Sequence, residues 1–268
     1  MKKIILFQAV LFITFQLSFT AEGQNKQPQR SIELKEKPLA FSVDAFGNLF
    51  VLQQNGSLVK YDTTGNIISL PGRKTSSSLW AIDAQNPYKI ILFNRDLQQA
   101  DMFNASFSKI NSYNLNNIDA GDIALFCGSH NSGFWAFTSQ GRDLIRFDDQ
   151  WGIVSQTNIL TLLEQDDFVP DILIESDRKV LLAQREGTAL IFDIFGNMLL
   201  RFPENANNYV LGNDILYFLK NDSIFAYQTV LHEETNIQFG IKNISNFAFS
   251  SPWFAIMSDN KIFLFLKS

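Results

Sequence analysis

Residues 48–70, NLFVLQQNGSLVKYDTTGNIISL, and residues 179–201, KVLLAQREGTALIFDIFGNMLLR, are two copies of one pattern. Aligned without gaps, nearly all of their apolar positions match, and they share the identical pairs Gln53/Gln184, Gly56/Gly187, Asp62/Asp193, Gly65/Gly196 and Asn66/Asn197. Each copy holds three short apolar stretches that are separated by turn residues, which is typical of consecutive antiparallel strands. The chain therefore repeats one β-sheet unit, and weaker copies fill the sequence around these two.

An aromatic residue closes the third strand of every copy, and the set is Tyr61, Phe103, Phe147, Phe192, Tyr227 and Phe265. A period of about 40 residues in short strands is typical of the blades of a β-propeller. We therefore predict an all-β, six-bladed β-propeller. Five or seven blades remain alternatives, because the fifth copy is short and residues 158–168 have the composition of a helical turn.

The last copy begins near Phe247 and has room for only three strands before the end of the sequence. A three-stranded blade would expose an unpaired edge. Residues 31–36, SIELKE, alternate apolar and charged side chains, as a half-buried strand does. We expect this segment to pair antiparallel with residues 261–267, so that the N-terminal strand completes the last blade and closes the ring.

The N-terminus has the pattern of a secretory signal, with Lys2 and Lys3 before an apolar run from Ile4 to Phe19. Small residues at Ala21 and Gly23 predict cleavage before Gln24. The expected division is a signal peptide over 1–23, a flexible leader over 24–30 and the propeller over 31–268. The mature protein is expected in the periplasm, in association with the outer membrane, and without a membrane span of its own.

Composition narrows the possible partners and chemistry. The formal net charge of −5 and a pI near 5.1 argue against nucleic acid, which is bound through basic surfaces. The only cysteine, Cys127, lies in an apolar strand, IALFCG, where a buried and unreactive thiol is expected. An intramolecular disulfide is impossible with one cysteine, so burial and strand pairing must supply the stability.

Motifs that could carry chemistry have simpler explanations. Asp-x-x-Gly-Asn occurs at 44–48, 62–66 and 193–197, where one carboxylate per loop predicts a turn and not a calcium site. The two histidines, His130 and His232, fall in predicted turns, far apart in the sequence. We therefore expect no catalytic residues, no metal, no cofactor and no enzymatic activity.

The two faces of the predicted disc differ in composition. Turns between second and third strands are polar, whereas turns between first and second or third and fourth strands carry large apolar residues. These apolar tips give a predicted partner-binding set of Phe46, Phe107, Trp151 and Phe195. The alternative is that these side chains fold back over the core and plug the turns.

The repeats also resemble a group of exported β-propellers from the Bacteroidota. The likeness is carried by FGNLFV (46–51), LVKYD (58–62), NPYKIILF (86–93), SGFW (132–135) and IFDIFG (191–196). This group includes the plug subunit that closes the periplasmic mouth of the type IX secretion translocon. The resemblance implies a non-enzymatic subunit that binds a protein partner in a periplasmic or outer-membrane complex.

The alternative function is a propeller that binds a small ligand or glycan, or hydrolyses one, in its central channel. The acidic candidates along first strands are Asp44, Asp83 and Asp171. An apolar, sealed channel mouth would favour the protein partner, and a polar, open mouth would favour the small ligand.

Overall fold

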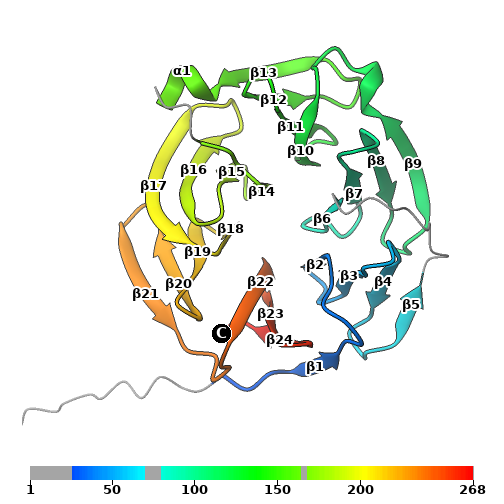
Figure 1. Ribbon diagram of the computed structural model, residues 1–268, viewed down its shortest axis with the longest axis vertical. Helices are drawn as coiled ribbons and strands as arrows, with labels where there is room; N and C mark the ends of the chain where they lie inside the picture. Colours follow the sequence, from blue (N-terminus) through cyan, green and yellow to red (C-terminus); the bar gives the residue numbers. More distant parts are fainter. Residues whose placement is uncertain (1–25, 70–79, 164–167, 268) are drawn as a thin grey trace, which may run out of the picture.

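A computed structural model describes residues 26–69, 80–163 and 168–267 of the protein. These residues form six four-stranded sheets that are arranged as blades around a central axis (Figure 1). The predicted all-β, six-bladed propeller is confirmed. The predicted signal peptide, residues 1–23, lies outside the described residues.

Every blade is an antiparallel meander in which the first strand is innermost. Blades one and two comprise β2 (Ala40–Val43), β3 (Leu49–Leu52), β4 (Leu58–Tyr61) and β5 (Ile67–Ser69), then β6 (Trp80–Asp83), β7 (Ile90–Asn94), β8 (Gln99–Phe103) and β9 (Lys109–Asn114). Blades three and four comprise β10 (Ile123–Gly128), β11 (Phe134–Thr138), β12 (Asp143–Phe147) and β13 (Ile153–Asn158), then β14 (Ile172–Ser176), β15 (Lys179–Ala183), β16 (Gly187–Asp193) and β17 (Met198–Ala206). Blades five and six comprise β18 (Asn208–Gly212), β19 (Ile215–Lys220), β20 (Ser223–Gln228) and β21 (Glu233–Ile237), then β22 (Ile244–Ser250), β23 (Trp253–Ser258), β24 (Lys261–Leu266) and β1 (Arg30–Glu33).

The ring closes through β1, as the sequence predicts. The strand pairs antiparallel with β24, and the register runs from Arg30 opposite Leu264 to Glu33 opposite Lys261. Ile32 and Leu34 are buried in the apolar cluster that joins blades six and one. The N-terminal segment thus supplies the outermost strand of the last blade (Figure 1).

The irregular segments lie between blades. The helical turn expected after blade three is present as α1 (Ile159–Leu163), and a 3-10 turn, η1 (Leu115–Asn117), follows blade two. The fifth blade is complete despite its short sequence, because Glu233–Ile237 forms its outer strand. No helix in the described part of the chain has the length and apolar character that a membrane crossing requires.

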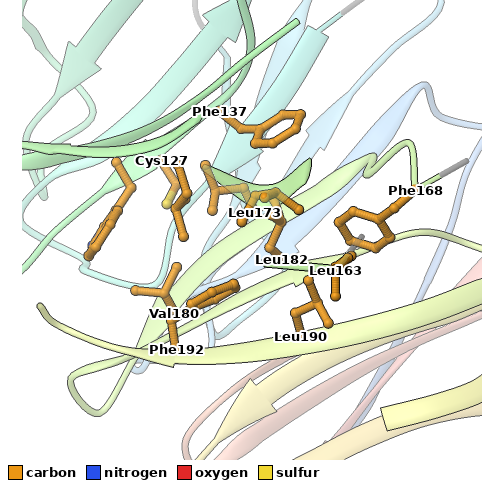
Figure 2. Close-up of a cluster of buried hydrophobic side chains, with 12 residues drawn as sticks. Cys127, Phe137, Leu163, Phe168, Leu173, Val180, Leu182, Leu190 and Phe192 are labelled. Carbon is orange, nitrogen blue, oxygen red and sulfur yellow. The ribbon is translucent and has the colours of Figure 1, made fainter. Parts of the chain in front are cut away.

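Apolar clusters fill the spaces between neighbouring blades. The cluster between blades three and four contains Cys127 and Phe137 from blade three and Val180 and Phe192 from blade four (Figure 2). Side chains on the two faces of each sheet therefore serve two different clusters, which follows from the alternation of side chains along a strand. Cys127 is buried as predicted, and burial raises the pKa of its thiol.

The Asp-x-x-Gly-Asn motifs are turns, as predicted. In the first, the Asp44 carboxylate accepts hydrogen bonds from the backbone of Phe46 (3.0 Å) and Asn48 (2.8 Å). Gly47 has a φ of +81°, a backbone conformation that favours glycine. The carboxylate is therefore used by its own turn.

Replacing Gly47 by alanine is expected to destabilise the protein. An added Cβ would lie 2.5 Å from Cε2 of Trp253, and the positive φ adds strain. Gly121 provides a matched control, because its φ is +75° and, beyond its chain neighbours, no heavy atom of the described residues would lie within 4 Å of its Cβ. Urea unfolding of Gly47→Ala should show a loss larger than that of Gly121→Ala by about 1–3 kcal/mol, the usual cost of overpacking. Equal losses would contradict the contact with Trp253.

Candidate functional site

The turns between first and second strands lie on the same face of the disc as the turns between third and fourth strands. The Arg30 guanidinium donates to two carbonyl oxygens on this face. One belongs to Gly47, in a turn between first and second strands, and the other to Asp62, in a turn between third and fourth strands. Arg146 likewise joins the turn at Ser129 to the turn at Ile194. We call this side, which carries the tips Phe46, Tyr88, Phe195 and Leu231, the aromatic face.

A cavity of about 380 Å³ opens at the centre of the aromatic face. All six blades line it through the ends of their innermost strands or the turns that follow, with Ala45, Asp83, Gly128, Glu175, Asn213 and Ser250 as one residue from each blade. Most of the side chains around it are amides, hydroxyls and charged groups. The channel mouth is therefore polar.

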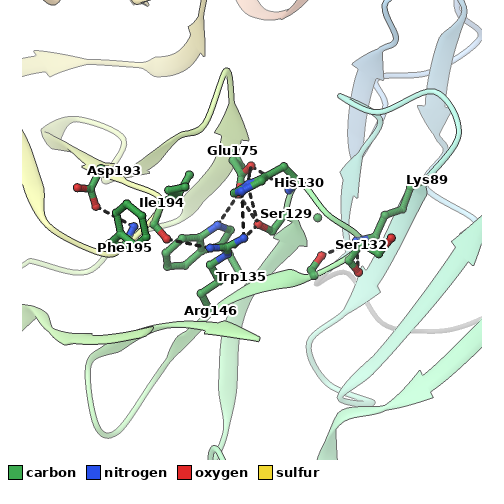
Figure 3. Close-up of polar contacts among 12 residues, drawn as sticks. Lys89, Ser129, His130, Ser132, Trp135, Arg146, Glu175, Asp193, Ile194 and Phe195 are labelled. Carbon is green, nitrogen blue, oxygen red and sulfur yellow. Dashed lines mark hydrogen bonds and ion pairs between the residues drawn. The ribbon is translucent and has the colours of Figure 1, made fainter. Parts of the chain in front are cut away.

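Glu175 is the centre of a hydrogen-bond network on one wall of this cavity (Figure 3). Its buried carboxylate accepts hydrogen bonds from the Ser129 hydroxyl (2.6 Å), the indole Nε1 of Trp135 (2.6 Å) and the backbone N–H of His130 (2.9 Å). Nδ1 of His130 lies 2.7 Å from the same carboxylate. Because Glu175 belongs to blade four and its partners belong to blade three, the network joins the two blades.

Arg146 completes the network behind His130. Its guanidinium lies 3.1 Å from Nε2 of His130 and donates to the Ser129 hydroxyl at 3.2 Å and the Ile194 carbonyl at 3.2 Å. An arginine has only donors, so Nε2 must accept and Nδ1 must carry the proton that is donated to Glu175. Both ring nitrogens of His130 are therefore engaged within the network.

The contact between Arg146 and Ile194 has a counterpart elsewhere in the ring. Lys60, at the matching position of β4, donates to the carbonyl of Ala105 at 2.9 Å. Ala105 and Ile194 are the second residues of equivalent turns in the next blade. A cation on the third strand thus binds the neighbouring turn in two of the blade junctions.

Lys89 and Asp83 form a second charged group on the cavity wall. Lys89 lies 3.9 Å from the ring centroid of Phe134 and donates to the carbonyl of Ser132 at 3.0 Å. Asp83 accepts hydrogen bonds from the backbone of Gly128 (2.8 Å) and Gln85 (3.0 Å). Burial raises the pKa of Asp83 and lowers the pKa of Lys89 to about 8, because removal from water disfavours either charge.

The titration of Lys89 has a predicted effect on stability. Its folded pKa of about 8 lies below the ordinary value of 10.5, so between these pH values the unfolded chain binds more protons than the folded chain. Stability should therefore rise with pH across this window, relative to Lys89→Met. NMR of ¹³C-labelled lysine should show a titration near pH 8 that the variant lacks; a midpoint above pH 10 would contradict the burial of this amine.

The predicted partner-binding residues fall into two pairs. Phe46 and Phe195 are exposed on the aromatic face, at 48% and 65%. Phe107 is buried against Phe50, and Trp151 is half-buried with its ring stacked on Phe134 at 4.9 Å. The prediction that Phe107 is an exposed tip is wrong, and Trp151 also follows the alternative of a side chain folded over the core.

The position within the turn explains this division. Phe107 and Trp151 take the fourth position, where the glycine stands in Asp-x-x-Gly-Asn, and have φ values of +62° and +67°. Phe46 and Phe195 take the third position, one residue before a glycine. Side chains at the fourth position are directed toward the core, whereas those at the third point outward. The third and fourth positions can be told apart in the sequence once the turns are aligned with one another.

Of the acidic candidates on first strands, only Asp83 lines the cavity. Asp44 is used by its turn, and Asp171 forms an exposed ion pair with Arg185. Sequence reasoning missed Glu175, Lys89 and the role of His130, because their partners lie in neighbouring blades. Within residues 26–69, 80–163 and 168–267, no three His, Cys, Asp or Glu side chains are grouped closely enough to hold a metal ion.

Known structures share the fold at low sequence identity. Virginiamycin B lyase from Staphylococcus aureus is 14% identical, with a TM-score of 0.55 over 88% of this chain and 87% of the lyase. An exported protein from Bacteroides fragilis is 11% identical, with a TM-score of 0.56 over 92% of this chain and 97% of that one. PorZ, an essential surface component of the type IX secretion system of Porphyromonas gingivalis, is 11% identical, with a TM-score of 0.54 over 87% of this chain and 31% of PorZ. No protein-family model matches the sequence, and no curated protein sequence matches it. These likenesses show the propeller fold alone.

Proposed function

We propose that the protein is an exported, non-catalytic propeller that binds a protein partner through its aromatic face. The carrying observation is the set of large apolar side chains exposed in turns of this face, namely Phe46, Tyr88, Phe195, Val230 and Leu231. Water-exposed aromatic and aliphatic groups with polar surroundings are typical of protein-binding surfaces. Phe46 and Tyr88 reinforce one another as an edge-to-face pair, with ring centroids 5.8 Å apart.

The opposite face has a different composition. Its turns are built from polar pairs such as Asn55–Gly56, Glu186–Gly187 and Asn221–Asp222. Leu97 is an exposed apolar residue in a second-to-third turn, at 50% exposure. The contrast between the faces favours binding on one side of the disc.

The partner belongs, in this proposal, to a periplasmic or outer-membrane assembly such as a secretion translocon. Support comes from the predicted signal peptide and from the resemblance to exported propellers of the Bacteroidota. PorZ, which has the same fold in part of its chain, is a component of a secretion system.

The test is affinity purification from the native cell envelope. The triple variant Phe46→Asp, Tyr88→Asp and Phe195→Asp is expected to lose a partner that the unchanged protein recovers, because aspartate opposes apolar burial. Leu97→Asp is the control, since it changes a similarly exposed residue on the opposite face. Mass spectrometry identifies the partner, and circular dichroism checks folding. A folded triple variant that still recovers the partner would refute docking through this face.

The central cavity favours a second candidate, the binding of a small polar ligand. Its volume lies within the range of about 300–1,000 Å³ that is usual for small-molecule sites. Its walls are polar, which is the character expected of a channel that binds a small ligand. Both functions are compatible, because the cavity opens at the centre of the aromatic face.

A further inference from the structure

We propose that the central cavity binds a neutral saccharide, with the sugar ring against Tyr88 and its hydroxyl groups bound by side chains of blades two and four. This inference rests on the second candidate function, a small polar ligand in the cavity. It names the chemical class of that ligand.

The first support is the hydrogen-bonding capacity that the cavity leaves unused. The Glu175 carboxylate is fully engaged by its own network, but other lining groups have no hydrogen-bond partner in the described part of the chain. These groups are the Nδ2 amide of Asn86, the Oε1 oxygen of Gln85, the hydroxyl of Ser176, the Oδ1 oxygen of Asp177 and the guanidinium of Arg178. They include both donors and acceptors, and they converge on one space. A sugar hydroxyl donates and accepts at once, so a ligand with several hydroxyls can satisfy both kinds.

The second support is the balance of charge. The acids Asp83, Glu175 and Asp177 line the same cavity as the bases Lys89 and Arg178, and Arg146 is bonded to the wall behind His130. An anion would meet three carboxylates, and a cation would meet two basic groups. Among the described residues the acids are not grouped closely enough to hold a metal ion. Desolvation already disfavours the charges of Asp83 and Lys89. The cavity is therefore suited to a polar ligand without net charge.

The third support is the aromatic pair at the rim. Asn86 and Lys89, on either side of Tyr88 in the sequence, line the cavity, as does Ala45, which precedes Phe46. Tyr88 is 66% exposed, and its contact with Phe46 leaves ring surface in contact with water. The C–H groups of a pyranose make one face of the ring apolar, and that face can cover an exposed aromatic ring while the hydroxyls reach the polar wall. Such a ligand would contact both the exposed aromatic ring and the polar wall of the cavity.

The test is ligand-observed and titration NMR on the purified mature protein. The probes are glucose, N-acetylglucosamine and cellobiose, with methylammonium and inorganic phosphate as the cationic and anionic comparisons. At least one sugar should bind with a Kd of about 1 mM or tighter, and the charged probes should not bind. Tyr88→Ala should weaken sugar binding at least fivefold, and Arg178→Gly should also weaken it. Arg178→Gly suits the local backbone, because φ at this position is +62°.

Phe195→Ala is the matched control. Phe195 is as exposed as Tyr88 and lies on the same face, but none of its neighbours in the sequence lines the cavity, whereas Asn86 and Lys89 beside Tyr88 do. The Phe195→Ala variant should bind sugar with the same Kd as the unchanged protein. The saccharide is excluded if no sugar binds at 50-fold the expected Kd, or if Tyr88→Ala and Arg178→Gly bind sugar normally. Binding of methylammonium or phosphate at the cavity would also exclude the saccharide but would leave the cavity as a small-ligand site. If no probe binds, the small-ligand candidate is excluded too. Neither result bears on docking of a protein at Phe195.

Discussion

Deletion of residues 24–37 is expected to lower the melting temperature by about 10 °C or more. The deletion removes β1, the outermost strand of blade six, and exposes the edge of β24. Ile32 and Leu34 are buried there, and loss of each such side chain costs about 2–5 kcal/mol. In a domain of this size, each kcal/mol corresponds to roughly 2–4 °C. Differential scanning calorimetry gives the measurement.

Two point variants separate ring closure from a general effect of truncation. Ile32→Asp places a charge in the cluster between blades six and one and should approach the effect of the deletion. Ser31→Asp changes the exposed residue beside it on the same strand and should leave the melting temperature nearly unchanged. A truncated protein that melts with the full mature chain would mean that β1 does not hold the ring closed.

The fold was largely predictable because it depends on short-range patterns. The repeated turn at Asp62 and Asp193, and the aromatic residue before each turn, fix the length of a blade. The alternation in residues 31–36 then identifies the missing strand. Boundaries were less accurate where propensity gives little signal: blade six begins at Ile244, whereas the sequence predicted its start near Phe247.

The site was less predictable because its residues meet only across blade junctions. Glu175 and His130 are 45 positions apart, and no local pattern links them. The sequence indicated that Phe46, Phe107, Trp151 and Phe195 lie in turns, and this is correct. An aromatic side chain points outward at the third position of the turn and inward at the fourth. The apolar character of the residue does not reveal which of these positions it takes.

Glu175→Ala should be among the most destabilising single substitutions in the protein. Its carboxylate is the shared acceptor for the Ser129 hydroxyl, the His130 backbone and the Trp135 indole, and Trp135 is fully buried. Removal leaves these donors without their shared acceptor. Breaking a buried charged network in this way costs about 3–5 kcal/mol. Urea unfolding followed by tryptophan fluorescence should report the loss, since Trp135 is part of the network.

The comparison with Glu175→Gln shows why the carboxylate itself matters. Glutamine preserves the shape and one acceptor oxygen, but its NH₂ group would face N–H and O–H donors that need an acceptor. Its destabilisation should therefore be intermediate between that of Glu175→Ala and that of Glu233→Ala, a control on the exposed strand β21 that should change stability little. If Glu175→Ala unfolds at the same urea concentration as the unchanged protein, the apolar cluster between blades three and four holds that junction without the network. A large loss of unfolding free energy would instead mean that the Glu175 network holds the cavity wall in place, beside the polar groups that we propose bind a ligand.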